Sequence, residues 1–92
     1  MTREELIRKI EAILVDNIID EPPPGPIDAD ENIIEKGYIS SLQMLDLVQL
    51  LETAFGISVP HYEVSPENFE TLNRLADYLT RKTSGENQKD SG

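Results

Sequence analysis

The sequence predicts an all-α fold, a small four-helix bundle with three main helices, one short helix and a long first loop. Three segments carry apolar side chains at the three- and four-residue spacing of one helix face, and none has proline in its interior. A fourth, shorter segment opens on Ser65 and Pro66, a serine cap followed by a first-turn proline. The apolar stretch "ISVP" is stopped by Pro60 and is too short to build a sheet. A chain of 92 residues forms one domain.

The first helix is predicted to run from about Arg3 to Ile19. Thr2 and Glu5 have the T-x-x-E spacing of a capping box, in which each residue satisfies a backbone amide of the other. The apolar side chains that follow at helical spacing are Leu6, Ile7, Ile10, Ile13, Leu14 and Ile18.

A long connection is predicted from Asp20 to Ile39. Its "EPPPGP" segment cannot be helical, because each proline lacks an amide donor and pushes its predecessor out of the helical region. A connection of this length is uncommon and is often functional. We expect it to pack on the core through four apolar side chains, which are Ile27, Ile33, Ile34 and Tyr38.

The second main helix is predicted from about Ser41 to Phe55 and stops at Gly56, a common C-terminal residue. Its apolar residues are predicted to form one core-facing side. That side consists of Leu42, Leu45, Val48, Leu51 and Phe55, widened by Leu47 and Leu50. The more polar side consists of Gln43, Asp46, Gln49, Glu52 and Thr53.

The short helix that starts at Ser65 cannot extend far past Phe69, and Thr71 is predicted to cap the last helix. An apolar stripe marks that last helix, formed by Leu72, Leu75, Ala76 and Leu79. The final "TSGENQKDSG" has no apolar residue to anchor it. The predicted organisation is therefore a helical domain over residues 1–82 and a disordered polar tail over residues 83–92.

The composition excludes several classes of function. Without cysteine there is no disulfide scaffold, thiolate zinc site or cysteine nucleophile. The acidic loop "DADENIIEKGYI" lacks the glycine and glutamate that a calcium loop requires, and His61 has no neighbouring ligand, so no metal site is expected. No apolar run is long enough to span a bilayer and no signal peptide is visible, so a cytoplasmic monomer is expected.

The formal net charge of −10 is concentrated in the middle of the chain, where Lys36 is the only basic residue between Ile10 and Asn73. Such a surface repels nucleic acid and anionic lipid and attracts partners with basic patches. The alternative is that the charge only keeps a small protein soluble. Both interpretations stay open on charge alone.

Two serines stand at the predicted start of the second main helix. Ser40 and Gln43 have the spacing of an S-x-x-Q capping box, which would make Ser41 the first helical residue. The Ser41 hydroxyl would then point outward beside unpaired amides and the positive end of the helix dipole, where an attached phosphate is stabilised. The plainer alternative is that both serines only cap the helix.

The sequence resembles the acyl carrier protein family and the related peptidyl and D-alanyl carriers, over about Arg3 to Lys82. The resemblance rests on a loop glycine, a serine–leucine pair, the helix that follows, a Phe-Gly-Ile end and a nearby proline. The "SPENFETLNRLADYL" stretch also resembles the third and fourth helices of stand-alone carriers. The residues in question are Gly37, Ser41, Leu42, Phe55, Gly56, Ile57 and Pro60.

The resemblance implies that Ser41 bears a 4′-phosphopantetheine arm, transferred from coenzyme A by a phosphopantetheinyl transferase. The arm of such carriers holds an acyl or aminoacyl group as a thioester. The carrier itself is not a catalyst; a loading ligase and downstream synthases or transferases act on the cargo. The pathways in which carriers of this family take part include fatty acid, lipid and secondary-metabolite synthesis. Ser40 replaces the aspartate that usually precedes the modified serine, and it remains the alternative site.

The second main helix is the usual docking element of the resembled family. The residues of this chain that we expect to contact partners are Leu42, Met44, Asp46, Gln49 and Glu52. For Met44 ordinary core packing is an equal alternative. This helix is less acidic than in housekeeping fatty acid carriers, which favours a specialised carrier. An unmodified docking adaptor is the alternative function, and a small enzyme fits worst because no group of catalytic side chains is evident.

Overall fold

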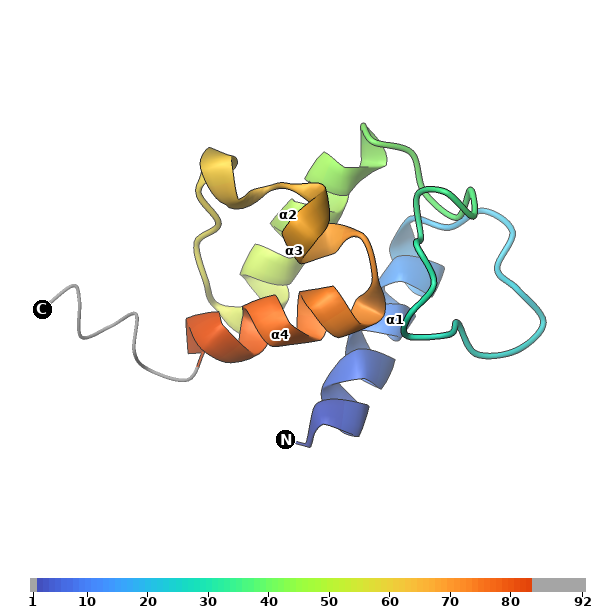
Figure 1. The fold of residues 1–92 in the computed structure, drawn as a ribbon, viewed down its shortest axis with the longest axis horizontal. Helices are drawn as coiled ribbons and strands as arrows, with labels where there is room; N and C mark the ends of the chain where they lie inside the picture. The colour runs from blue at the N-terminus through green and yellow to red at the C-terminus, as the bar shows by residue number, and fades with distance from the viewer. Residues whose placement is uncertain (1, 84–92) are drawn as a thin grey trace, which may run out of the picture.

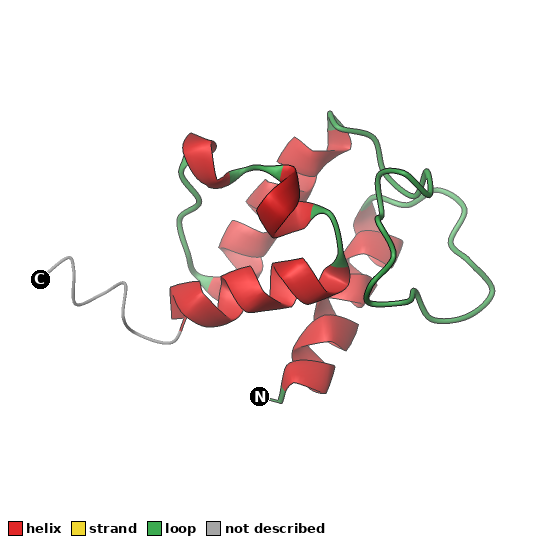
Figure 2. Cartoon of the chain, in the orientation of Figure 1, coloured by secondary structure: helices red, strands yellow, loops and turns green. Residues whose placement is uncertain are grey.

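The computed structural model describes residues 2–83 and contains only helices and loops over that range, which confirms the predicted all-α class (Figures 1 and 2). A short 3₁₀ helix precedes the short α-helix. The elements are α1 (Arg3–Asn17), α2 (Gln43–Phe55), η1 (His61–Glu63), α3 (Pro66–Phe69) and α4 (Leu72–Thr83).

The capping box predicted at the start of α1 is present. The amide of Glu5 donates to the Thr2 hydroxyl at 3.1 Å, and the amide of Thr2 donates to the Glu5 carboxylate at 2.9 Å. The helix ends two residues earlier than predicted, where the amide of Ile18 bonds to the carbonyl of Leu14 as a C-cap.

Removing this cap tests how much it stabilises the fold. Thr2→Ala should lower the free energy of unfolding by about 1 kcal/mol, because an amide of the first turn loses its acceptor. Urea denaturation measures this loss. Thr53→Ala is the control, since Thr53 is exposed inside α2 and its hydroxyl bonds to no described residue. Equal losses in the two variants would contradict a capping role.

The core lies between α1 and the two helices that contact it, α2 and α4, and α3 packs against α4. Among the helix pairs, α1 and α4 share the most extensive contact, so the first and last helices are direct neighbours. Side chains from every α-helix and from the long loop are fully buried. The largest of them are Ile10, Leu14, Ile27, Ile33, Leu47, Leu51, Phe69, Leu72, Leu75 and Leu79.

The long connection is anchored as the sequence predicts, with Ile27 and Ile33 fully buried and Ile34 and Tyr38 partly buried against the core. Its backbone also pairs with the region where α4 begins. The amide of Ile33 donates to the carbonyl of Glu70 at 2.8 Å. The amide of Asn73 donates to the carbonyl of Ala29 at 3.0 Å. The loop is therefore fixed at its centre, although its proline-rich part projects to one side (Figure 1).

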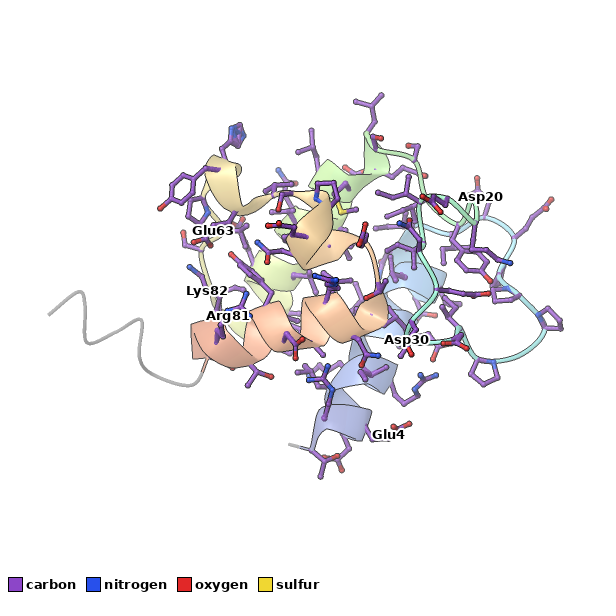
Figure 3. The ribbon with its side chains drawn as sticks, in the orientation of Figure 1. Glu4, Asp20, Asp30, Glu63, Arg81 and Lys82 are labelled. Carbon is purple, nitrogen blue, oxygen red and sulfur yellow. The ribbon has the colours of Figure 1, made fainter. Side chains whose placement is uncertain are left out.

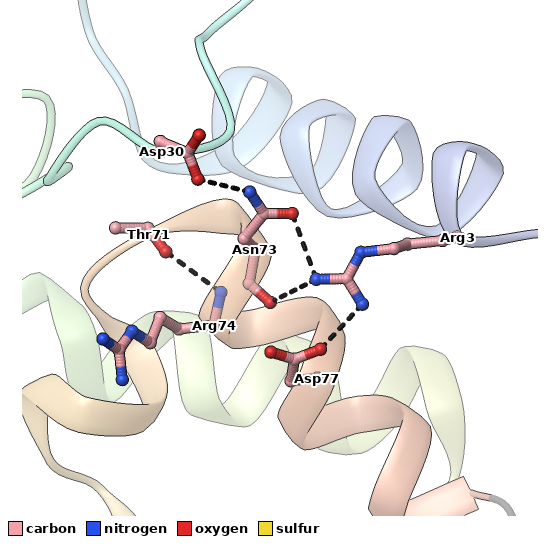
Figure 4. A network of polar contacts seen from close by, with 6 residues as sticks. All are labelled: Arg3, Asp30, Thr71, Asn73, Arg74 and Asp77. Atoms are coloured by element: carbon pink, nitrogen blue, oxygen red, sulfur yellow. Dashed lines mark hydrogen bonds and ion pairs between the residues drawn. The ribbon is translucent and has the colours of Figure 1, made fainter.

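A polar network continues this attachment toward α1 (Figure 4). The Asn73 side chain donates to the carboxylate of Asp30 and accepts from the Arg3 guanidinium at 3.1 Å. Arg3 also pairs with Asp77 at 2.7 Å. Asn73 is half-buried but the charged groups of the network are exposed, so the ion pair between Arg3 and Asp77 contributes little to stability.

Two helix ends differ in detail from their predictions. The side chain of Ser65 makes no capping bond to α3, whose start is set instead by Pro66 in the first turn. Thr71 caps α4 as predicted, accepting from the amide of Arg74 at 3.0 Å. Thr83, placed in the tail by the sequence, is the last residue of α4. The rest of the predicted tail, residues 84–92, lies outside the described residues.

A buried tyrosine ties η1 to α4. The Tyr78 hydroxyl donates to the Glu63 carboxylate at 2.6 Å, and Lys82 lies 3.4 Å from the same carboxylate. Figure 3 shows Glu63 near Lys82 and Arg81, at the C-terminal end of α4. Burial, and then the bond to Glu63, raise the pKa of Tyr78 above its ordinary value.

This raised pKa predicts a loss of stability at alkaline pH. The fold favours neutral Tyr78, so its contribution is fully present below the unfolded-state pKa, about 10, and is lost as pH rises beyond it. Parent and Tyr78→Phe should differ in free energy of unfolding by a constant amount below pH about 9, and by less above pH about 10. Denaturant titrations across this range measure the difference. A pH-independent difference would contradict the assignment.

Candidate functional site

The start of α2 contains the reciprocal cap that the sequence predicts. The amide of Gln43 donates to the Ser40 hydroxyl at 3.1 Å, and the amide of Ser40 donates to the Gln43 side-chain oxygen at 2.8 Å. Leu42 already has helical backbone angles, φ −69° and ψ −37°. The regular helix begins at Gln43, two residues later than predicted, because the first turn is tight: the amide of Leu45 bonds to the carbonyl of Leu42.

Ser41 is left free by this arrangement. Its side chain is exposed, and its hydroxyl bonds to no residue within 2–83. The backbone amides of Ser41 and Leu42 likewise donate to no acceptor in that range. An exposed hydroxyl beside two unpaired amides at the positive end of a helix suits an attached phosphate.

A short turn at Gly37 precedes this site in the chain. The amide of Gly37 donates to the carbonyl of Ile34, and the amide of Tyr38 donates to the carbonyl of Ile33. Gly37 itself has φ +82°, a left-handed conformation that residues with a Cβ rarely adopt. A Cβ there would meet no atom within 4 Å, so the backbone angle and not lack of space requires glycine.

A hollow of about 200 Å³ opens beside Ser41. One side is α2, one is the long loop, and the third is the segment that joins η1 to α3. Its lining is mostly apolar and consists of Ile34, Ser41, Met44, Leu45, Val64, Ser65 and Pro66. The candidate site therefore combines a free hydroxyl with an apolar recess next to it.

Comparison with known proteins identifies the kind of site. The family model described as the phosphopantetheine attachment site matches residues 6–79, which contain the whole arrangement. The chain belongs to this family of carrier proteins. Its members carry a covalent 4′-phosphopantetheine group.

Individual relatives are of two kinds. An acyl carrier protein of Rubrobacter xylanophilus is 32% identical over 80 residues, which cover 86% of this chain and 93% of the relative. A D-alanyl carrier protein of Lactococcus lactis subsp. cremoris is 36% identical over 56 residues, 61% of this chain and 71% of the relative. An acyl carrier protein of Thermosynechococcus vestitus is 25% identical over 84 residues, 91% of this chain and 99% of the relative.

The surface of this carrier around α2 differs in part from the sequence prediction. Asp46 and Gln49 are exposed, as expected of residues that contact partners. Leu42 was predicted both on the core-facing side of the helix and among the partner contacts; it is 78% exposed, so its place on the core-facing side is wrong. Met44 is only 6% exposed, so of its two predicted alternatives, partner contact and core packing, the structure shows core packing. It turns into the core together with Leu47, Val48 and Leu51.

Leu45, which the sequence placed in the core, is 51% exposed instead. It stands three residues after Leu42, so the two leucines share one face near Ser41. That spacing was the only signal in the sequence for an apolar surface at this site. Glu52 is half-buried, and its carboxylate accepts from the amide of Val59 at 2.8 Å, so part of its bonding capacity is used within the fold.

Other kinds of site are not evident in the described part of this carrier. Within residues 2–83, no three His, Cys, Asp or Glu side chains gather as metal ligands would. No helix in that range is long and apolar enough to cross a bilayer.

Proposed function

We propose that this carrier holds an acyl or aminoacyl group as a thioester on a 4′-phosphopantetheine arm attached to Ser41, and presents it to partner enzymes. The observation that most supports Ser41 as the attachment site is the different bonding of the two neighbouring serines. Ser40 is engaged in both bonds of the capping box, whereas the Ser41 side chain is exposed and its hydroxyl bonds to none of residues 2–83.

The attachment reaction requires little from the carrier except a reachable nucleophile. The Ser41 oxygen attacks the phosphorus of coenzyme A that bears the pantetheine, a new oxygen–phosphorus bond forms, and the bond to the departing adenosine bisphosphate breaks. The hydroxyl proton leaves to a base of the transferase. The amides of Ser41 and Leu42 then lie next to the phosphodiester, and their partial positive charge stabilises it.

Partner enzymes would load and unload the cargo, with the helical domain of residues 2–83 as a non-catalytic carrier. The exposed start of α2 is the docking surface that we propose, with Leu42 and Leu45 as apolar contacts and Asp46 and Gln49 beside them. The net charge of −10 favours partners with basic patches and makes association weaker at high salt. The partners that we propose are soluble enzymes of fatty acid, lipid or secondary-metabolite synthesis, and the place of the reaction is the cytoplasm.

The test is the intact mass of the parent chain after incubation with coenzyme A and a broad-specificity phosphopantetheinyl transferase. One added arm, mapped by peptide analysis to Ser41, is the expected result. No addition, in a tube where a known carrier is modified and with a cognate transferase also tried, would favour the unmodified docking adaptor. An arm mapped to Ser40 would move the site.

A further inference from the structure

A hollow of about 510 Å³ lies between one face of α1 and the proline-rich part of the long loop. Ala12 is at the centre of that helix face, and because it has no side chain beyond Cβ it leaves room for the hollow. No residue lines both this hollow and the one beside Ser41, so the two are separate surfaces. The lining consists of Arg8, Glu11, Ala12, Val15 and Asp16 from α1, and of Pro22, Pro23, Gly25 and Pro26 from the loop.

The loop side of this hollow is fixed at both ends. Ile19 precedes the prolines and Ile27 follows them, and both isoleucines are buried. The Glu11 carboxylate accepts from the amide of Ile27 at 2.7 Å, and the Arg8 guanidinium pairs with Glu11 and lies 3.5 Å from the carbonyl of Ile27. The prolines themselves have few accessible backbone conformations. The hollow is therefore held open before anything binds, which lowers the entropic cost of binding.

The walls of the hollow are mostly apolar, but the uncompensated charge around them is negative. Of the lining residues only Arg8 is basic, and it already pairs with Glu11. Asp16 is exposed, and its carboxylate pairs with no residue within 2–83. Asp20 and Glu21, directly before the prolines, are exposed and lack a side-chain partner in the same range. A complementary occupant is apolar at its centre and cationic at its edges.

We propose that this hollow is a second docking surface, which binds a partner protein through an aromatic side chain flanked by lysine or arginine. Aromatic side chains are the groups that line the grooves of proline-recognition domains, because proline-rich segments are apolar and stiff. Pro22 and Pro26 are exposed and Pro23 is half-buried, so their rings are accessible to such a side chain.

This surface has a use that the start of α2 cannot provide. A partner bound between α1 and the prolines leaves Ser41 and the docking residues of α2 uncovered, since none of them lines the hollow. One protein can therefore retain the carrier while other enzymes act on its arm. Docking here does not require the arm, so the inference is tested on the unmodified chain and does not depend on modification of Ser41.

The experiment titrates the ¹⁵N-labelled full chain with three blocked tripeptides, Lys-Trp-Lys, Lys-Ala-Lys and Glu-Trp-Glu, and follows amide chemical shifts. Prolines have no amide, so Gly25, Ala12 and Val15 report on the hollow. We expect Lys-Trp-Lys to shift these amides with a Kd on the order of 1 mM. Lys-Ala-Lys should bind at least about tenfold more weakly, because it lacks the buried aromatic ring. Glu-Trp-Glu should not bind, because its charges are repelled.

Two pairs of variants separate the apolar and the charged parts of the surface. Ala12→Gln fills the hollow with a neutral, helix-compatible side chain and should weaken Lys-Trp-Lys about tenfold. Its matched control is Ala54→Gln, at an exposed alanine of α2 outside the hollow. Asp16→Asn should weaken the same peptide about two- to fivefold at low salt. Its control, Glu67→Gln, removes one charge from exposed α3 and should have little effect.

Several results would overturn the proposal. Equal binding of Lys-Trp-Lys and Lys-Ala-Lys by the parent would show attraction by charge alone. Absence of shifts at the three reporter amides, or equal effects of Ala12→Gln and Ala54→Gln, would exclude the hollow as the binding surface. Shifts at the same amides that grow with protein concentration in the absence of peptide, together with a dimer in analytical ultracentrifugation, would assign the hollow to a second copy of this chain instead.

Discussion

We expect Ser41→Ala to take up no phosphopantetheine under conditions that modify the parent completely. The substitution removes the attacking oxygen and little else, because the Ser41 hydroxyl bonds to no described residue and its side chain is exposed. The fold should therefore be unchanged, and Thr71 and Thr2, whose hydroxyls accept capping bonds elsewhere, should not substitute for it.

Ser40→Ala is the matched control for this result. It shortens the neighbouring side chain by the same atom, but it breaks the capping box and should lower the free energy of unfolding by about 1 kcal/mol. Modification should persist, because the Ser41 hydroxyl is retained. Intact mass reads out the arm, and urea denaturation reads out stability. The reverse pattern, with the arm lost in Ser40→Ala and kept in Ser41→Ala, would contradict the assignment.

The largest expected loss of stability is in Phe69→Ala, about 3–5 kcal/mol. Phe69 is fully buried at the end of the single turn of α3, and its ring centroid lies 5.4 Å from that of Tyr78. Truncation leaves a cavity and removes an aromatic contact at once. In a domain whose total stability is about 5–15 kcal/mol, such a loss is a large share.

Tyr62→Ala provides the contrast, since this aromatic residue is 83% exposed on η1 and packs on little. It should change the free energy of unfolding by less than about 0.5 kcal/mol. Both variants are compared with the parent by urea denaturation. A similarly small change in the free energy of unfolding in both variants would show that burial of Phe69 does not stabilise the packing of α3.

Local patterns were sufficient to predict much of this fold. The capping boxes at Thr2 and Ser40 and the Thr71 cap each depend on residues at most three positions apart, so the sequence contains all of the information needed. The same holds for Ser41. Once Ser40 was assigned to the cap, Ser41 was left as the residue whose hydroxyl is available.

The orientation of α2 could not be predicted in this way. The helix is apolar around much of its circumference, so its periodicity allows more than one core-facing side. The side that packs is decided by α1 and by the other elements that surround α2. As a result Leu45 is exposed, the reverse of its predicted place, and Met44 is buried, which the sequence left as one of two alternatives. The Glu63–Tyr78 bond, across fifteen positions, was invisible for the same reason.

The close packing of α1 against α4 has a consequence for how the chain is made. Arg3 and Asp77 are 74 positions apart, yet they form an ion pair between the first and last helices. On the ribosome, the apolar stripe of α1 therefore emerges long before its partner is synthesised, and it stays exposed while the middle of the chain is translated. We expect cooperative folding only after α4 is released, so that newly made chains become substrates for the transferase only at that stage.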